Sequence, residues 1–292
     1  MPCAASPATA APQEVFPDPE HGVESLIAAN RSNDLVALRR ILGPAGTKLI
    51  ESGDAVADRN ARARFVAAYD EAHRIGLSGA DKAVLSVGAQ EWPMPIPLIR
   101  APSGWRFDTE AGKREILDRR IGRNELSVIE VCREYVKAQR EYASMNARDG
   151  AAPDYAQHLM SRDDKRDGLY WPSKPDEAES PLGPLVARAH AAGYPPGGPL
   201  HASSQPYYGY YFRILTRQGT HASGGPKNYI VNGRMAGGFG MIAFPARYGD
   251  SGIMTFIVSA DGIVFEKNLG RHTERLVRSI DQYDPDPTWR TP

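Results

Sequence analysis

The spacing of apolar residues changes twice along this chain, and this alternation constrains the fold more than any other feature. From Pro17 onward, apolar side chains recur at the period of amphipathic helices, and after Gly79 they recur at the period of strands. The same order, a helix and then strands, begins again at Asn124. A chain of 292 residues is long enough for two cores. We therefore predict an α+β protein with one domain over residues 15–118 and a second over residues 119–292.

The N-terminal domain is predicted to pack three helices on a small antiparallel sheet. The helices are marked by Val23, Leu26 and Ile27, by the run Leu35–Leu42 after the capping pair Asn33-Asp34, and by Phe65, Val66 and Tyr69. The strands are expected at residues 83–87, 91–100 and 105–108. Helices over a curved sheet that ends in Trp105-Arg106-Phe107 resemble cystatin-like and nuclear-transport-factor-like folds, whose cone often encloses a cavity.

Alternating prolines give the second of these strands an unusual edge. Pro93, Pro95 and Pro97 lack backbone N–H groups, and alternate residues of a strand direct those groups to the same side. The segment is therefore predicted to be one strand at the outside of its sheet, where the prolines block the addition of a further strand. One face of this strand would carry the apolar side chains of Trp92, Met94, Ile96 and Leu98.

The C-terminal domain is predicted to place one long helix behind an antiparallel meander. The helix is expected to run from Asn124 to about Met145, with Cys132 on its buried face as a small core residue. Asp261-Gly262 has the composition of a two-residue hairpin turn between the last two strands. The remaining elements are strands at residues 208–216, 228–231, 239–244, 253–259 and 263–267, and short helices at 182–192 and near 273–280.

Charge and hydropathy exclude two classes of protein. The 35 basic and 35 acidic side chains leave no net charge to attract a polyanion, so no nucleic-acid partner is expected. No run of apolar residues approaches the roughly 18–20 that cross a bilayer, so no membrane span is expected. Residues 1–14 are small and Pro-rich, and Ala8-Thr9-Ala10 has the form that precedes a signal-peptidase cut. They are predicted to be the disordered remnant of a signal peptide, which would make the protein periplasmic or secreted.

Seven short segments spread over residues 15–290 resemble one known family. They are Gly22-Val23-Glu24-Ser25-Leu26, Ile41-Leu42-Gly43-Pro44, Ser52-Gly53-Asp54, Trp92-Pro93-Met94-Pro95-Ile96-Pro97-Leu98, Asp167-Gly168-Leu169-Tyr170-Trp171-Pro172, Gly209-Tyr210-Tyr211-Phe212-Arg213-Ile214-Leu215 and Tyr248-Gly249-Asp250-Ser251-Gly252. Together they are similar to an exported bacterial family described as domain of unknown function 2950. The resemblance implies export, and it assigns no activity and no catalytic residue.

The second domain also resembles the globular heads of type IV pilins and pseudopilins, over about residues 120–290. The likeness lies in the order of the segments along the chain. A helix containing residues 136–142 comes first, the segment 209–212 follows, and the segments 252–258 and 261–264 come last. Pilins begin this helix with a long apolar anchor, whereas polar residues precede it here. The resemblance therefore implies a pilin-like head reused as a soluble envelope module, not a filament subunit.

No catalytic residue is predicted. Gly249-Asp250-Ser251-Gly252 resembles the nucleophile segment of chymotrypsin-like proteases, but the chain has no matching histidine segment, and the position suits a turn between strands. The seven histidines lie far apart, and none forms a pair with metal-ligand spacing.

Two groups of residues are candidate binding sites. The first group consists of four aromatic residues, Tyr170, Trp171, Tyr208 and Tyr210. Their side chains could form a binding surface of rigid anchors, or they could belong to the core of the sheet. Asp284 and Asp286 alternate in a Pro-stiffened tail and are candidate calcium ligands, because calcium takes several oxygen ligands. Some pseudopilins bind calcium in a C-terminal loop, and a solvated tail is the alternative. No other cofactor is predicted.

These observations leave two functions open. The first is a non-enzymatic envelope protein whose pilin-like head binds another envelope protein or a surface component. The alternative is a hydrolase or small-ligand-binding enzyme with a pocket in the N-terminal cone. Carboxylates or histidines converging in a deep cleft would favour the enzyme, and a solid apolar core in that domain would count against it.

Overall fold

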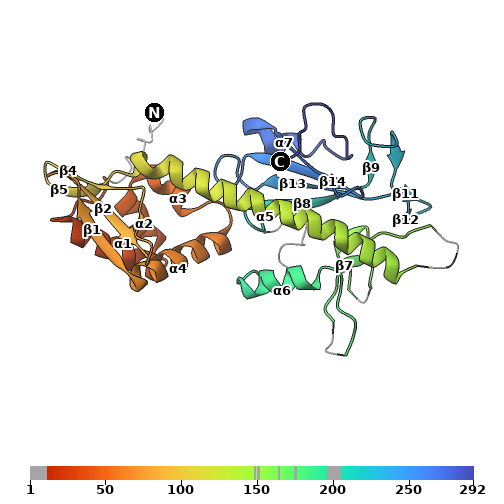
Figure 1. Ribbon diagram of the computed structural model, residues 1–292, viewed down its shortest axis with the longest axis horizontal. Helices are drawn as coiled ribbons and strands as arrows, with labels where there is room; N and C mark the ends of the chain where they lie inside the picture. The colour runs from red at the N-terminus through yellow and green to blue at the C-terminus, as the bar shows by residue number, and fades with distance from the viewer. Residues whose placement is uncertain (1–11, 148, 150–151, 164, 174–175, 196–204) are drawn as a thin grey trace, which may run out of the picture. The chain divides into compact units, whose positions relative to one another are not determined.

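The chain forms two compact units, of which the first ends at Arg119 and the second begins at Arg120. A computed structural model describes residues 12–147, 149, 152–163, 165–173, 176–195 and 205–292 (Figure 1). Most of the predicted signal remnant, residues 1–11, lies outside the described residues. Both units combine helices with antiparallel sheets, which confirms the predicted α+β class.

The first unit places its helices before its strands, as the periodicity predicts. Its helices are α1 (Pro19–Arg31), α2 (Leu35–Leu42), the 3₁₀ turn η1 (Pro44–Gly46), α3 (Thr47–Ile50) and α4 (Ala55–Glu71). Its strands are β1 (His73–Leu77), β2 (Lys82–Val87), β3 (Trp92–Pro93), β4 (Leu98–Ala101) and β5 (Gly104–Phe107). The sequence does not predict β1, because its side chains are exposed or half-buried and show no apolar alternation.

Aspartates begin the three longer helices of this unit. Asp18 accepts a hydrogen bond from the backbone N–H of His21, and Asp34 accepts from Val36 and Ala37. Asp54 caps α4 in the same way through Ala57. Each carboxylate satisfies N–H groups that the first helical turn leaves without a partner, so short polar residues fix where these helices start.

The single proline-edged strand predicted at residues 91–100 is wrong. The sheet has the order β1-β2-β4-β5, and β3 pairs separately with β2, so β4 lies inside the sheet between two neighbours. The chain leaves the strand conformation between β3 and β4, where Pro95 and Pro97 lie. A residue without an N–H group cannot continue the ladder, and the prolines therefore split the segment instead of lining one edge.

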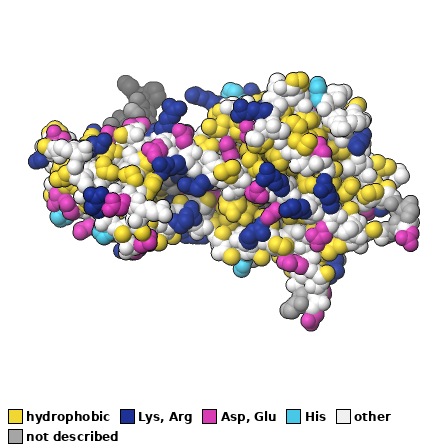
Figure 2. Space-filling view, in the orientation of Figure 1, with side chains coloured by type: hydrophobic (Ala, Val, Ile, Leu, Met, Phe, Trp, Pro, Cys, Tyr) yellow, Lys and Arg dark blue, Asp and Glu magenta, His cyan; other side chains and the backbone are white. Residues whose placement is uncertain are grey.

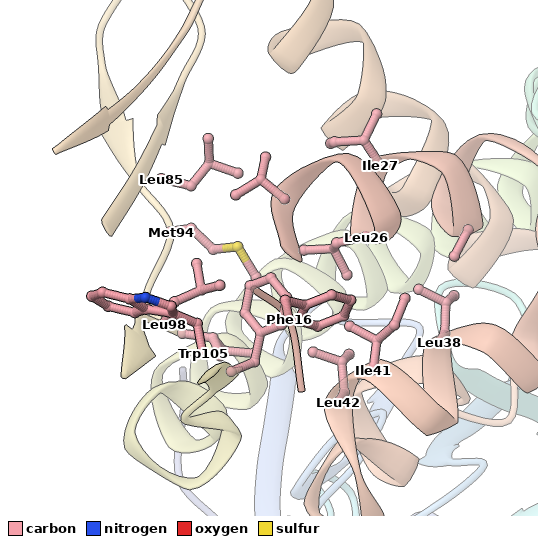
Figure 3. Packing of buried hydrophobic residues seen from close by; sticks show 14 of the residues in the cluster. Phe16, Leu26, Ile27, Leu38, Ile41, Leu42, Leu85, Met94, Leu98 and Trp105 are labelled. Atoms are coloured by element: carbon pink, nitrogen blue, oxygen red, sulfur yellow. The ribbon is translucent and has the colours of Figure 1, made fainter. Parts of the chain in front are cut away.

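An apolar core lies between the helices and the sheet of the first unit. Figure 3 shows Phe16 among Leu26, Ile41 and Leu42 of the helices and Leu98 and Trp105 of the strands. Phe16 also exchanges backbone hydrogen bonds with Trp105 at 2.7 Å in each direction, which fixes the entering chain against β5. The described side chains at the centre of this unit are thus packed against one another.

The second unit contains one long helix, a four-stranded sheet and several short elements. These elements are the continuation of α5 (Thr109–Met145), β6 (His158–Met160), β7 (Gly168–Tyr170), α6 (Gly183–Ala191), β8 (Tyr210–Leu215), β9 (Arg217–Gln218), β10 (Lys227–Asn228), β11 (Ile230–Val231), β12 (Arg234–Met235), β13 (Gly240–Pro245), β14 (Met254–Ser259), β15 (Val264–Asn268), η3 (Gly270–His272) and α7 (Thr273–Leu276).

Helix α5 begins at Thr109, well before the predicted start at Asn124. Asn124 does not cap the helix, because its side-chain amide donates to the carbonyl of Ser251 at 2.8 Å. The added turns are polar, and ion pairs four residues apart support them, including Glu115–Arg119 and Arg114–Asp118. The periodicity of apolar residues does not detect these first turns, because their side chains are polar and are paired by charge.

The predicted meander and its helix are present. The sheet order β15-β14-β13-β8 follows the chain, and β14 and β15 form the hairpin expected at Asp261-Gly262. The Tyr135 hydroxyl of α5 donates to the carbonyl of Gly240 at 3.0 Å, and Arg140 donates to the carbonyl of Ala260 at 2.8 Å. These bonds fix the helix against the sheet.

The surface carries charges of both signs. On the face seen in Figure 2, basic and acidic side chains are mixed over each unit, with hydrophobic atoms between them. Within the described ranges, none of the helices combines the length and the apolar character that crossing a bilayer requires.

Candidate functional site

A cleft of about 620 Å³ in the second unit is the candidate functional site. Its volume lies within the roughly 300–1,000 Å³ of typical ligand pockets. Three stretches of chain form its wall: the end of β7 with Tyr170 and Trp171, the following polar segment, and one side of α6. The polar segment contributes Glu177, Glu179 and Ser180, and α6 contributes Gly183, Val186, Ala187 and His190.

Two short strands and a hydrogen bond position this wall. Strands β6 and β7 run parallel, and a Cβ atom at Gly168 would lie 2.5 Å from the backbone of Met160 and Ser161. Only glycine therefore permits this close approach. The N–H of Leu182 donates to the carbonyl of Leu169 at 2.9 Å, which ties the start of α6 to β7.

Two buried polar atoms in the cleft wall have no hydrogen-bond partner among the described residues. They are the indole nitrogen Nε1 of Trp171 and the hydroxyl Oγ of Ser180, in residues that are 7% and 2% exposed. A buried polar group without a partner costs about 1–3 kcal/mol, and folded proteins retain few of them. Both residues line the same cleft, and both atoms are shielded from solvent.

Acidic side chains give the cleft its charge. Glu177 accepts from the guanidinium of Arg166 at 2.6 Å, and that guanidinium also lies 5.4 Å from the ring centroid of Trp171. Within the described part of the chain, no ion pair or hydrogen bond neutralises the carboxylate of Glu179. No lysine or arginine is among the described residues that line the cleft.

Neither Ser180 nor Cys132 has the surroundings of an activated nucleophile in the described part of the chain. A serine nucleophile needs a base within hydrogen-bond reach, and Ser180 has no such partner among the described residues. Cys132 is not a nucleophile either, because burial raises the pKa of its thiol to about 12. Gly249-Asp250-Ser251-Gly252 forms the expected turn between β13 and β14, and Ser251 is fully buried there.

The structure separates the four predicted aromatic residues. Tyr170 and Trp171 line the cleft, whereas Tyr208 and Tyr210 are not among its lining residues. Tyr210 is fully buried, and its hydroxyl donates to the carbonyl of Met254 at 3.0 Å. Tyr208 is half-buried, and its ring lies beside that of Tyr207 at a tilt of 41°, with ring centroids 4.2 Å apart.

The two predicted calcium ligands have partners within the chain. Asp284 accepts from the backbone N–H of His221 at 2.8 Å, and Asp286 accepts from the backbone N–H of Thr288 at 2.8 Å. The hydrogen bonds from Thr288 are the main reason that the pKa of Asp286 is lowered. Among the described residues, no three His, Cys, Asp or Glu side chains gather closely enough to hold a metal ion. Calcium binding in this tail stays a prediction.

Sequence reasoning missed Glu177, Glu179, Ser180 and His190. They belong to the long connection at residues 146–206, where the sequence predicts one short helix at 182–192 and no other regular element. A usable signal was present, because a connection of this length inside a compact domain is uncommon unless it carries function.

Comparison with known proteins identifies a family and no close relative. The model of the family described as "Protein of unknown function (DUF2950)" matches residues 13–291. No curated protein and no solved structure matches the sequence.

Proposed function

The chain belongs to the DUF2950 family, and from that premise we propose that it is a non-enzymatic binding module of the bacterial cell envelope, periplasmic or secreted. Its second unit, with a helix on an antiparallel sheet as in a pilin head, engages another envelope protein through the cleft at Trp171 and Ser180. A segment of that partner occupies the cleft.

One observation carries this proposal. Trp171 Nε1 and Ser180 Oγ are buried in the cleft wall without a hydrogen-bond partner among the described residues. Both atoms are shielded from solvent, so the two side chains turn toward the partner segment when it binds. The segment then supplies both missing bonds, because a peptide carries a carbonyl acceptor at every residue and a donor at most of them. The chain then bears the cost of two unsatisfied groups only while the cleft is empty.

Site-specific photocrosslinking in the source cells tests this function. A benzoylphenylalanine in place of Tyr170 should crosslink to a discrete envelope protein, which mass spectrometry then identifies. The matched control carries the same residue at Val36 of α2, a 69% exposed position in the first unit. Trp171→Phe, which removes the N–H donor, should reduce the crosslink at position 170. No adduct, or the same adducts at positions 36 and 170, would reject the proposal.

A hydrolase or small-ligand enzyme is the second candidate. The observation in its favour is that Glu177, Glu179 and His190 line the same cleft of the second unit. Against a pocket in the first unit, the described residues at its centre form a packed apolar core. Turnover of chromogenic ester or glycoside substrates by the purified chain, abolished in Glu179→Gln, would support the enzyme.

A further inference from the structure

The charges and hydrogen-bonding groups of the cleft define what it recognises. We infer that it takes the basic side chain, lysine or arginine, of a partner polypeptide, with Glu179 and Ser180 receiving the cation and Trp171 donating to a backbone carbonyl beside it. This inference rests on the proposed function and names the chemistry of the partner.

The balance of charge favours a cation. Glu177 and Glu179 line the cleft, and no lysine or arginine is among its described lining residues. The chain itself shows how this wall holds a basic group, because the Arg166 guanidinium lies over the Trp171 ring while it pairs with Glu177. Glu179 offers a second carboxylate that no described residue neutralises.

The unpartnered atoms specify the rest of the ligand. The Ser180 hydroxyl can accept a hydrogen bond from an ammonium or guanidinium group, whereas the Trp171 indole can only donate. A free amine satisfies Ser180 and leaves Trp171 without an acceptor. A basic residue within a peptide provides the cation and a neighbouring carbonyl together, so a polypeptide fits both groups where a simple amine fits one.

The indole N–H of Trp171 reports binding directly. The 292-residue chain has four tryptophans, and Trp171→Phe assigns the Trp171 indole signal in a ¹H–¹⁵N spectrum. The probe is acetyl-Gly-Lys-Gly-amide, compared with the norleucine peptide, which keeps the stem without the ammonium, and with the glutamate peptide. The lysine peptide should shift the Trp171 signal saturably. The affinity of the norleucine peptide should be lower by at least about fivefold.

Two variants locate the contact. Glu179→Gln should lose the preference for lysine over norleucine, while Thr255→Val, which alters a buried hydroxyl of β14 outside the cleft lining, should keep it. Equal binding of the lysine and norleucine peptides, or tighter binding of the glutamate peptide, would overturn the inference. So would binding of n-butylamine as tight as that of the lysine peptide, because the carbonyl contact would then contribute nothing.

The crosslinking experiment tests the proposed function, and the peptide titration tests the inferred basic ligand, so either can be rejected without the other. A crosslinked partner that lysine peptides do not displace would overturn the inference about the basic side chain and leave the binding function standing. Selective lysine-peptide binding without any crosslinked partner would support the recognition chemistry and reject the proposed protein partner.

Discussion

The side chain of Glu179 occupies the space that a Cβ atom at Gly183 would need: such an atom would lie 2.5 Å from Glu179 Cγ and 2.6 Å from its Oε1. Gly183 is the first residue of α6. The carboxylate therefore rests at the positive end of a helix, a favourable position for a negative charge. Because residue 183 has no Cβ atom, the side chain of Glu179 has room to lie where it lines the cleft.

Gly183→Ala should weaken lysine-peptide binding as much as Glu179→Gln does, because the added methyl group displaces the carboxylate. Titration of the Trp171 indole signal measures both affinities. Gly122→Ala is the control, since Gly122 lies within α5 and a Cβ atom there meets nothing within 4 Å. This control should raise the free energy of unfolding by about 0.5–1 kcal/mol and leave peptide affinity unchanged. Unchanged affinity in Gly183→Ala would contradict the positioning role.

Ser180→Ala should stabilise the ligand-free protein, or leave its stability unchanged, while it weakens peptide binding. The substitution removes a buried hydroxyl without a described partner, so the free energy of unfolding should rise by up to about 1 kcal/mol. Chemical denaturation measures that change. Thr255→Val removes a comparable hydroxyl that is 0% exposed, and it should stabilise without altering affinity. A loss of more than about 1 kcal/mol in Ser180→Ala would show that its hydroxyl already has a partner.

Local chemistry predicts the regular parts of this fold. The capping carboxylate of Asp34 and the Asp261-Gly262 turn act on adjacent backbone, so the sequence alone locates α2 and the β14–β15 hairpin. The alternating prolines gave a wrong prediction because their effect depends on tertiary contacts, not on adjacent backbone. Whether they line an edge or split a strand depends on which strands flank them, and β2 and β5 take both sides of β4.

The cleft depends on tertiary contacts that no local pattern encodes. Strands β6 and β7 have three residues each and run parallel, which is too short for a visible period. Their contact requires Gly168, and the place of Glu179 requires Gly183. The sequence offers Tyr170 and Trp171 as candidate anchors, but only the folded chain shows that they line one cleft with Glu177 and Glu179.

Tyr210→Phe should lower the free energy of unfolding by about 1 kcal/mol, because it removes the hydroxyl that donates to the Met254 carbonyl in the core. Peptide affinity should not change, since Tyr210 does not line the cleft. Tyr211→Phe on the same strand is the matched control: the Tyr211 hydroxyl forms no hydrogen bond with the other described residues, and the effect should stay below about 0.5 kcal/mol. A loss of peptide binding in Tyr210→Phe would restore Tyr210 as a ligand contact.

Cys132 should make stability fall as the pH rises above 9. In the unfolded chain the thiol ionises near its ordinary pKa of 9.0, whereas burial raises the folded pKa to about 12. Between these values the folded state holds the proton that the unfolded state has lost, so higher pH favours unfolding. From pH 9 to 10 this thiol should remove about 1 kcal/mol of stability.

Removal of the thiol separates the contribution of Cys132 from that of the buried tyrosines. Burial raises the pKa of Tyr283 to about 12 from an ordinary 10.0, so this hydroxyl also lowers stability between pH 9 and 10, by about 0.3–0.4 kcal/mol. Denaturation at both pH values in a Cys3→Ser background, with and without Cys132→Ala, should show a fall that is about 1 kcal/mol larger where Cys132 is present. The comparison uses the change in stability between the two pH values. The cost of the small cavity left by alanine is the same at both values and therefore cancels. Equal falls in both proteins would mean that the thiol ionises as easily in the folded chain as in the unfolded one.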